Sequence, residues 1–256
     1  MPSLSVASPE PLAGKTTVSA GLEQKFQAQG RSDVVITEVP TGDSPAAESG
    51  ARVVVVAAET TAAGDLAAFS KSFGDAAAGV IVNRVPQKRI EATRTGYEAA
   101  GINLLAMLPE DRILAAPTLG EIAAALDAEV RFLDGNRLQP VERPLIASIS
   151  ADPGQGYFTR HGATAVIVRS DKPDLQLAAI NAGANCLIVT GSLPILSYVL
   201  DRAAEDEIPL MRTNLDTIAA VHQIEELIGT TPFAGGEAKL RRIGELLSEV
   251  DVSALI

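Results

Sequence analysis

The sequence predicts an α/β protein made of two units, each built around a parallel β-sheet. Short apolar runs alternate with helix-like stretches along most of the chain, which is typical of parallel strands joined by crossover helices. Residues 53–56 are four consecutive valines, as expected for a strand that is buried on both faces of a sheet. The alternation stops across the mixed, polar stretch 127–144 and then starts again. We therefore expect a larger unit, a smaller unit and a C-terminal helix.

The first unit, residues 1–126, is expected to contain five strands. Each is a short apolar run that ends at a polar or turn-forming residue. The expected strands are 4–7, 33–38, 52–58, 78–83 and 102–108. Apolar residues at helical spacing predict helices at 14–30, 62–73, 89–100 and 119–126.

The second unit, residues 145–233, is expected to follow a connecting region at 127–144. Its expected strands are 145–149, 163–168, 185–189 and 209–212, and its expected helices are 174–182, 194–204 and 217–228. The tail, 234–256, contains an amphipathic helix with an apolar stripe on one face. The stripe consists of Leu240, Ile243, Leu246 and Leu247. Because exposing such a stripe to water is unfavourable, the tail either folds back on the chain or packs on a neighbouring copy.

Charge and composition argue against several classes of protein. The chain of 256 residues carries a formal net charge of -11, and an acidic surface repels phosphate backbones, so no nucleic-acid partner is expected. Cys186 is the one cysteine, lies in an apolar run and is expected to be a small buried hydrophobe. The sequence shows no secretion signal, and no apolar run approaches the ~20 residues needed to span a bilayer. We therefore expect a cytoplasmic protein without a membrane partner.

The segment 7–16 has the order strand, loop, Gly-Lys-Thr, helix. In such a loop, backbone amides at the helix N-terminus face an anion. Lys15 would reach the β- and γ-phosphates of a nucleotide, and the Thr16 hydroxyl would bind Mg²⁺. A full loop of this kind begins with glycine, whereas this one has Pro9 there and Pro11 after it, which removes two amide donors. The alternative is an ordinary helix N-terminus that contains Gly-Lys-Thr by chance.

Two further polar residues are expected at the same edge of the sheet, where strands end and ligands of open α/β sheets collect. Glu38 ends the second strand and is a candidate Mg²⁺ ligand, or else a solvated loop acid. Asn83 ends the fourth strand, where its amide is a candidate reader of an adenine edge or else forms an Asx turn before Pro86. Asp33 begins the second strand, so it is expected at the opposite edge, in a structural role.

With these residues, the first half resembles the dethiobiotin-synthetase-like P-loop domain, in the version found in the N-terminal region of long phosphate acetyltransferases. The segments that carry the resemblance are 14–17, 33–38, 79–84 and 108–110. The resemblance implies a P-loop NTPase-like fold with ATP or ADP and Mg²⁺ as cofactors. It implies Thr16 and Glu38 as metal residues. The implied nucleotide-binding residues are Ala13, Gly14, Lys15, Thr16, Thr17, Asn83 and Arg84.

The second half resembles the DRTGG domain that follows the P-loop domain in the same proteins. The motif reads Asp171-Lys172 and Thr190-Gly191-Ser192 here. These residues follow strand ends on one edge of a small sheet, so they form a second candidate site for a small anion or nucleotide. Lys172 replaces a planar guanidinium with a point charge, and Ser192 adds a side chain where glycine allows close approach. The alternative is that these residues stabilise turns at a domain or subunit contact.

Two departures from these relatives bear on activity. Residues 30–32 directly join the first helix to the second strand, where the relatives carry a long segment with substrate contacts. The acetyltransferase catalytic domain is absent from the sequence. We therefore expect no acetyl transfer and no dethiobiotin-type carboxylate activation.

Three functions remain open. The chain is a nucleotide-binding regulatory or sensor protein, a slow ATPase or ATP-dependent ligase, or a structural protein whose P-loop has decayed. The sequence assigns no catalytic residue. A homodimer is expected in which the second unit supplies much of the contact, because closed two-fold pairs are the commonest soluble assembly.

Overall fold

The structure is a computed structural model that describes residues 1–256 except Met1, 44–49, 149–155 and 161–164. The chain divides into two compact units. The first unit contains Met1–Leu114 together with Glu237–Ile256, and the second contains Ala115–Gly236. Both are α/β units, as the sequence predicts.

A five-stranded parallel sheet forms the centre of the first unit, with strand order β2-β1-β3-β4-β5. The strands are β1 (Ser3–Ala7), β2 (Val35–Glu38), β3 (Arg52–Ala58), β4 (Ala77–Val85) and β5 (Leu104–Pro109). The four valines of β3 are buried and pair with β1 on one side and β4 on the other. The continuous apolar run is therefore explained by a strand that is covered on both faces.

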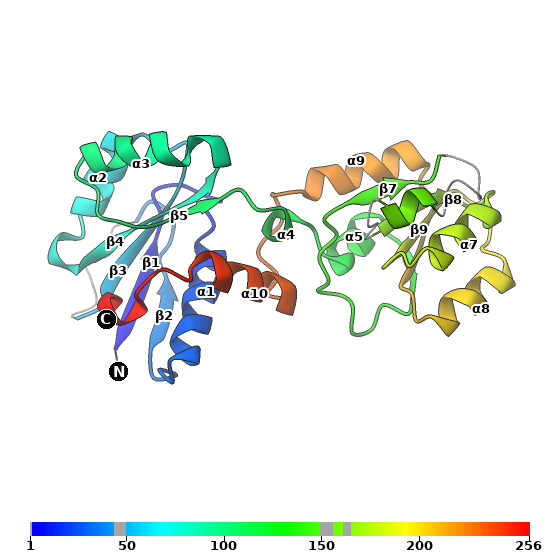
Figure 1. Cartoon of the computed structure of the whole chain (residues 1–256), viewed down its shortest axis with the longest axis horizontal. Helices are drawn as coiled ribbons and strands as arrows, with labels where there is room; N and C mark the ends of the chain where they lie inside the picture. Colours follow the sequence, from blue (N-terminus) through cyan, green and yellow to red (C-terminus); the bar gives the residue numbers. More distant parts are fainter. Residues whose placement is uncertain (1, 44–49, 149–155, 161–164) are drawn as a thin grey trace. The chain divides into compact units, whose positions relative to one another are not determined.

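Helices cover both faces of this sheet (Figure 1). One face packs against α1 (Lys15–Ala28), α10 (Glu237–Leu246) and the short helix η3 (Val252–Leu255). The other packs against α2 (Ala63–Lys71) and α3 (Ile90–Ala99). The short helices η1 (Gly74–Ala76), η2 (Gln87–Arg89) and α4 (Arg112–Ala115) complete this part of the chain. Because β2 lies on one side of β1 and β3 on the other, the winding direction reverses between β1 and β3, which creates a switch point at their carboxyl ends.

The C-terminal tail folds back onto the first unit, which is one of the two placements that the sequence leaves open. Ile243 and Leu247 of the tail are fully buried against α1. The Lys25 ammonium of α1 donates to the carbonyl oxygens of Leu247, Ser248 and Val250 at 2.6, 2.9 and 2.7 Å. Ile243 and Leu247 are thus covered within one chain and Leu246 packs against the same core, whereas Leu240 is half-buried. The stripe is therefore largely covered and is no longer a strong argument for a dimer.

The second unit is built on another five-stranded sheet, with order β6-β10-β9-β8-β7. Its strands are β6 (Glu129–Arg131), β7 (Pro144–Ile146), β8 (Ala165–Arg169), β9 (Leu187–Thr190) and β10 (Leu210–Thr213). One face packs against α7 (Pro173–Asn181) and α8 (Ser197–Glu205), and the other against α5 (Leu119–Ala125) and α9 (Thr217–Leu227). Four strands are parallel, and β6 pairs antiparallel with β10.

Strand β6 lies in the stretch that the sequence analysis treats as a connecting region. It has three residues, of which only Val130 is apolar, so it has no recognisable strand pattern. It forms because the edge of β10 offers unpaired backbone groups. Helix α5 also belongs to the second unit, so the observed division after Leu114 differs from the expected one after residue 126.

Cys186, the one cysteine of the sequence, lies in the core of the second unit. Cys186 is fully buried, and burial raises the pKa of its thiol well above the ordinary range. A neutral thiol of this kind behaves as a small hydrophobe.

None of the helices in the described part of the chain has the length and apolar character needed to cross a bilayer.

Replacing Gly21 tests the contact between α1 and the tail. A methyl group at Gly21 would approach Ile243 Cγ1 and Leu247 Cδ1 to 2.6 Å, so Gly21→Ala is expected to destabilise the first unit by about 1 kcal/mol despite its higher helix propensity. Gly96→Ala is the matched control, since Gly96 lies within α3 and has nothing within 4 Å. That variant should gain roughly 0.5–1 kcal/mol. Urea unfolding measures the free energy of unfolding of both variants. If Gly21→Ala stabilised the protein as much as Gly96→Ala, the close packing of α1 against the tail would be contradicted.

Candidate functional site

The loop between β1 and α1 lies at the carboxyl edge of the first sheet. Gly14 is the N-cap residue of α1 and adopts φ +92°, a conformation that favours glycine. The first amide to donate within the helix is that of Val18, to Gly14 O at 3.0 Å. No described side chain caps this N-terminus. The amides of residues 14–17 precede the helical ladder and donate to no other described residue, so they are free to face an anion.

Three predicted residues meet at the start of α1. The Lys15 ammonium donates to Val39 O at 2.5 Å and to Thr41 Oγ1 at 3.1 Å. The Thr16 hydroxyl donates to Glu38 Oε2 at 3.0 Å. The parallel pairing of β1 with β2 brings Glu38 to this position, beside the helix that follows β1. The arrangement supplies a cation, open amides and two adjacent oxygen ligands.

The oxygen pair alone does not make a metal cage. Among the described residues, no group of three or more His, Cys, Asp or Glu side chains is placed to hold an ion. Mg²⁺ usually keeps several waters and binds through one or two protein oxygens plus phosphate oxygens. Thr16 Oγ1 and Glu38 Oε2 fit that mode of binding.

Asn83 of β4 holds the loop between β1 and α1 by a side-chain hydrogen bond. Its side chain is buried, its Nδ2 donates to Ala13 O at 3.0 Å, and its Oδ1 accepts from Arg84 N at 2.9 Å. The amide is therefore used within the protein, in a manner that differs from both expected roles, the adenine contact and the Asx turn. Arg84 is exposed and adopts a left-handed backbone with φ 59°. The Ala13 side chain is buried in the core, so only its backbone can contribute to a site.

Glu10 crosses the switch point, a role that the sequence analysis does not assign. Its Oε1 accepts hydrogen bonds from Ala58 N at 2.9 Å and from the Thr61 hydroxyl. Ser8 is fully buried and bonds to Glu10 twice, donating from Oγ to Glu10 O at 2.6 Å and accepting from Glu10 N at 3.3 Å. The loop after β1 is thus fastened to the end of β3. A lone glutamate between two prolines carries no pattern that could have predicted this contact.

Tyr97 of α3 contacts the segment that follows β3. Its hydroxyl donates to Glu59 O at 3.2 Å and to Thr61 O at 2.8 Å. Burial raises the pKa of Tyr97, and the carboxylates of Glu59 and Glu10 raise it further. The phenol therefore stays protonated and acts as a donor.

Asp33 lies away from this site, as expected. Its Oδ1 accepts from Arg31 Nε at 3.1 Å, and this hydrogen bond lowers the pKa of Asp33. The contact is local, within the short join between α1 and β2.

In the second unit, Thr190 and Gly191 form part of a tight turn. Thr190 is buried, and its hydroxyl lies 2.9 Å from Thr217 Oγ1. Gly191 has φ +101°, and a methyl group there would approach Ser170 Oγ to 2.9 Å. The Gly191 amide donates to Thr213 O and Leu215 O. These contacts stabilise the ends of three strands.

A pocket of about 690 Å³ opens beside Asp171 and Lys172. It lies at the carboxyl ends of β7 and β8, and Gly191 and Ser192 are not among its lining residues. Arg169 Nη2 and Asp171 Oδ2 form an ion pair of 2.7 Å within the pocket wall. Two of the five residues predicted for the second site therefore line a real cavity.

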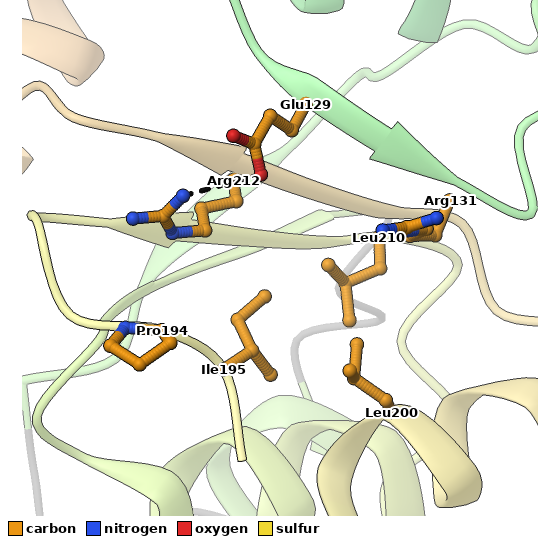
Figure 2. A pocket seen from close by; sticks show the side chains of 7 residues that line it. All are labelled: Glu129, Arg131, Pro194, Ile195, Leu200, Leu210 and Arg212. Atoms are coloured by element: carbon orange, nitrogen blue, oxygen red, sulfur yellow. Dashed lines mark hydrogen bonds and ion pairs between the residues drawn. The ribbon is translucent and has the colours of Figure 1, made fainter. Parts of the chain in front are cut away.

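A second pocket in this unit, of about 120 Å³, lies beside Arg212 (Figure 2). In Figure 2, Ile195, Leu200 and Leu210 point toward one another below the strands. The Arg212 guanidinium donates to Ser192 O at 3.0 Å and Leu193 O at 3.3 Å and pairs with Glu129 at 3.2 Å. The pocket is small, and Arg212, one of the two arginines that line it, already holds the Ser192 turn against β10 and β6.

Comparison with known proteins identifies this unit. The model of the DRTGG domain family matches residues 121–227. The chain contains a DRTGG domain. The match begins within α5 and ends with α9, so the domain lies inside the second unit.

Several solved structures are similar to part of the chain. One of them contains the CBS and DRTGG domains of the regulatory region of Clostridium perfringens pyrophosphatase, complexed with the activator diadenosine tetraphosphate. The sequences are 21% identical, and the TM-score is 0.39. The similarity covers 46% of this chain and 50% of that chain, so the chain spans about half the length of its neighbour.

Replacing Gly14 tests the geometry of the first-unit loop. A methyl group at Gly14 would lie 2.2 Å from Asn83 Nδ2, so Gly14→Ala must displace the side chain that holds the loop. The control is Gly30→Ala, because Gly30 shares the positive φ but has nothing within 4 Å. We expect Gly14→Ala to cost about 1–3 kcal/mol more than Gly30→Ala in urea unfolding. The excess should shrink in an Asn83→Ala background, and an equal cost for both glycines would rule out the close approach.

Proposed function

We propose that the chain is a nucleotide-binding regulatory or sensor protein that binds ATP or ADP with Mg²⁺ at the loop between β1 and α1. The observation that carries the proposal is the meeting of Gly14, Lys15 and the Thr16–Glu38 pair at the carboxyl edge of a parallel sheet. Ligands of such sheets bind outside the carboxyl ends of the strands, next to a switch point.

The residues present fit a polyphosphate. The amides of residues 14–17 and the helix dipole favour negative charge. Lys15 keeps its ammonium at the same helix start through Val39 O and Thr41 Oγ1, and neither partner is charged. An anionic phosphate is therefore a stronger acceptor than its present ones. When bound, the metal would supply charge neutralisation at the phosphates, with Thr16 and Glu38 as its protein contacts.

A regulatory role is favoured over catalysis by the short join between α1 and β2. Helix α1 ends at Ala28 and β2 begins at Val35, which leaves no room for a substrate-binding segment. The Glu10 carboxylate is engaged with β3, and Glu38 with Thr16. A slow ATPase remains the second candidate, since the same loop would hold the phosphates.

The structural alternative also has a specific observation behind it. The two acceptors of Lys15 and the carboxylate of Glu10 hold the loop closed through the protein's own contacts. If these contacts replaced a nucleotide, the P-loop would serve only the fold. Binding measurements separate the two cases.

Replacing Lys15 tests the nucleotide site. Lys15→Ala should weaken ATP and ADP binding by about tenfold or more, since one charge-assisted hydrogen bond contributes roughly 1.5–3 kcal/mol. Titration calorimetry with ATP, ADP and AMP, with and without Mg²⁺, measures the effect. Lys71→Ala is the control, because Lys71 is exposed at the far end of α2. Unchanged ATP affinity in Lys15→Ala excludes a phosphate site, and no binding by the wild type favours the structural alternative.

Replacing Glu38 tests the metal. Glu38→Gln should reduce the gain in ATP affinity on adding Mg²⁺ by on the order of fivefold, about 1 kcal/mol. Affinity without Mg²⁺ should stay the same or rise, because a negative charge near the phosphates is lost. Glu98→Gln, at an exposed position near the C-terminal end of α3, should change neither. An undiminished Mg²⁺ effect in Glu38→Gln would remove Glu38 from the site.

We also propose that the second unit forms a homodimer through the segment after β9 and the first turn of α8. Leu193, Leu196 and Tyr198 are 51%, 44% and 47% exposed, and neighbouring exposed apolar residues commonly mark a protein contact. Light scattering after gel filtration should give a dimer mass for the wild type and a monomer mass for Leu196→Glu. Ile218→Glu, at an exposed position of α9, should remain dimeric. A monomeric wild type at micromolar concentration would refute the proposal.

A further inference from the structure

We infer that the DRTGG domain has its own binding site for a nucleoside monophosphate, in the pocket at the carboxyl ends of β7 and β8. The inference concerns a second site, and its location does not depend on the proposed site in the first unit. The inference rests on the cavity, on the charged residues that line it and on the exposed apolar side chain of Ile146.

The pocket has the size and position of a ligand site. Its volume of about 690 Å³ lies within the range of about 300–1,000 Å³ that small-molecule sites occupy. It opens at the carboxyl ends of two parallel strands. The first turn of α7 and Thr217, the first residue of α9, both line it. These helices cover opposite faces of the sheet, so the pocket is bounded from both sides.

The exposed apolar surface of the pocket is the side chain of Ile146. Ile146, Ile167, Leu175 and Pro173 are the apolar residues that line the pocket. Ile167 and Leu175 are buried in the cores on opposite faces of the sheet, whereas Ile146 is 44% exposed. The open face of Ile146, beside polar groups, suits a flat ring that is covered on one face.

The charges limit the number of phosphate groups. The lining contains two cations, Arg169 and Lys172, and two carboxylates, Asp171 and Asp174. Arg169 is already paired with Asp171 at 2.7 Å, whereas Lys172 has no ion pair with any described residue, so Lys172 is the cation available to an anion. One such ammonium in a lining that also holds two carboxylates suits a single phosphate and disfavours a triphosphate, because the carboxylates repel added negative charge. The carboxylates can accept hydrogen bonds from ribose hydroxyls.

Buried residues hold the polar groups in place. The Thr217 hydroxyl, which lines the pocket, is held 2.9 Å from the buried Thr190 Oγ1. Gln176 is buried, and its Nε2 donates to the carbonyls of Arg169 and Ser170 at 3.0 and 3.4 Å. Thr190 and Gln176 are therefore positioning residues. This gives the threonine of the family motif a role next to a cavity that it does not itself line.

Titration of the full-length chain with AMP tests the inference. The experiment uses the Lys15→Ala background, in which nucleotide binding at the proposed first site is weakened. We expect saturable binding of one AMP per chain, weakened about tenfold or more by Lys172→Ala and by Ile146→Asp. Lys172→Arg should retain most of the affinity, since it keeps the charge. Adenosine and inorganic phosphate should each bind more weakly than AMP, because each lacks half of the contacts.

Two outcomes would overturn the inference. One is the absence of saturable AMP binding in the Lys15→Ala chain. The other is AMP binding that neither Lys172→Ala nor Ile146→Asp weakens while circular dichroism shows that both variants are folded. Failure of the first-unit site is recognised separately, as ATP binding that Lys15→Ala does not change. A Thr217→Val variant adds an independent reading, since it removes a lining hydroxyl without changing charge and should also weaken AMP binding.

Discussion

Parallel pairing of buried strands is the constraint on which both units depend. The backbone groups of β3 and of β8 are covered on both faces, so they must bond to neighbouring strands. Crossover helices then return the chain to the same starting edge each time. As a result, every parallel strand of a sheet delivers its following loop to one edge. Both candidate sites lie at such an edge, where ligands of open α/β sheets bind.

In the first unit, the edge is shaped by contacts between loops that are distant in sequence. Asn83 holds the carbonyl of Ala13, and Glu10 holds the end of β3. Gly14 allows both the left-handed turn and the close approach of Asn83. The loop is therefore set before any ligand arrives, which lowers the entropic cost of binding. The same rigidity would also serve a purely structural loop.

In the second unit, the family motif is divided between two tasks. Asp171 and Lys172 line the pocket, whereas Thr190 and Gly191 shape the neighbouring turn. Arg212 fixes the third motif position, Ser192, through its carbonyl oxygen. The sequence motif thus contains two kinds of residue: some line the pocket, and others stabilise the turn next to it. The proposed ligand-binding role therefore concerns Asp171 and Lys172, whereas Thr190 and Gly191 stabilise the turn.

The fold class, nearly all strands and helices, and the grouping of Gly14, Lys15, Thr16 and Glu38 at one edge could be predicted from the sequence. These follow from local patterns and from the geometry of parallel sheets, which need no knowledge of distant contacts. The roles of Glu10, Asn83 and the tail, and the existence of β6, became visible only in the folded chain. Each depends on a partner far along the chain: Ala58 for Glu10, Ala13 for Asn83 and Lys25 for the tail. A short polar strand such as β6 forms because β10 presents an edge to pair with, and no local pattern encodes that edge.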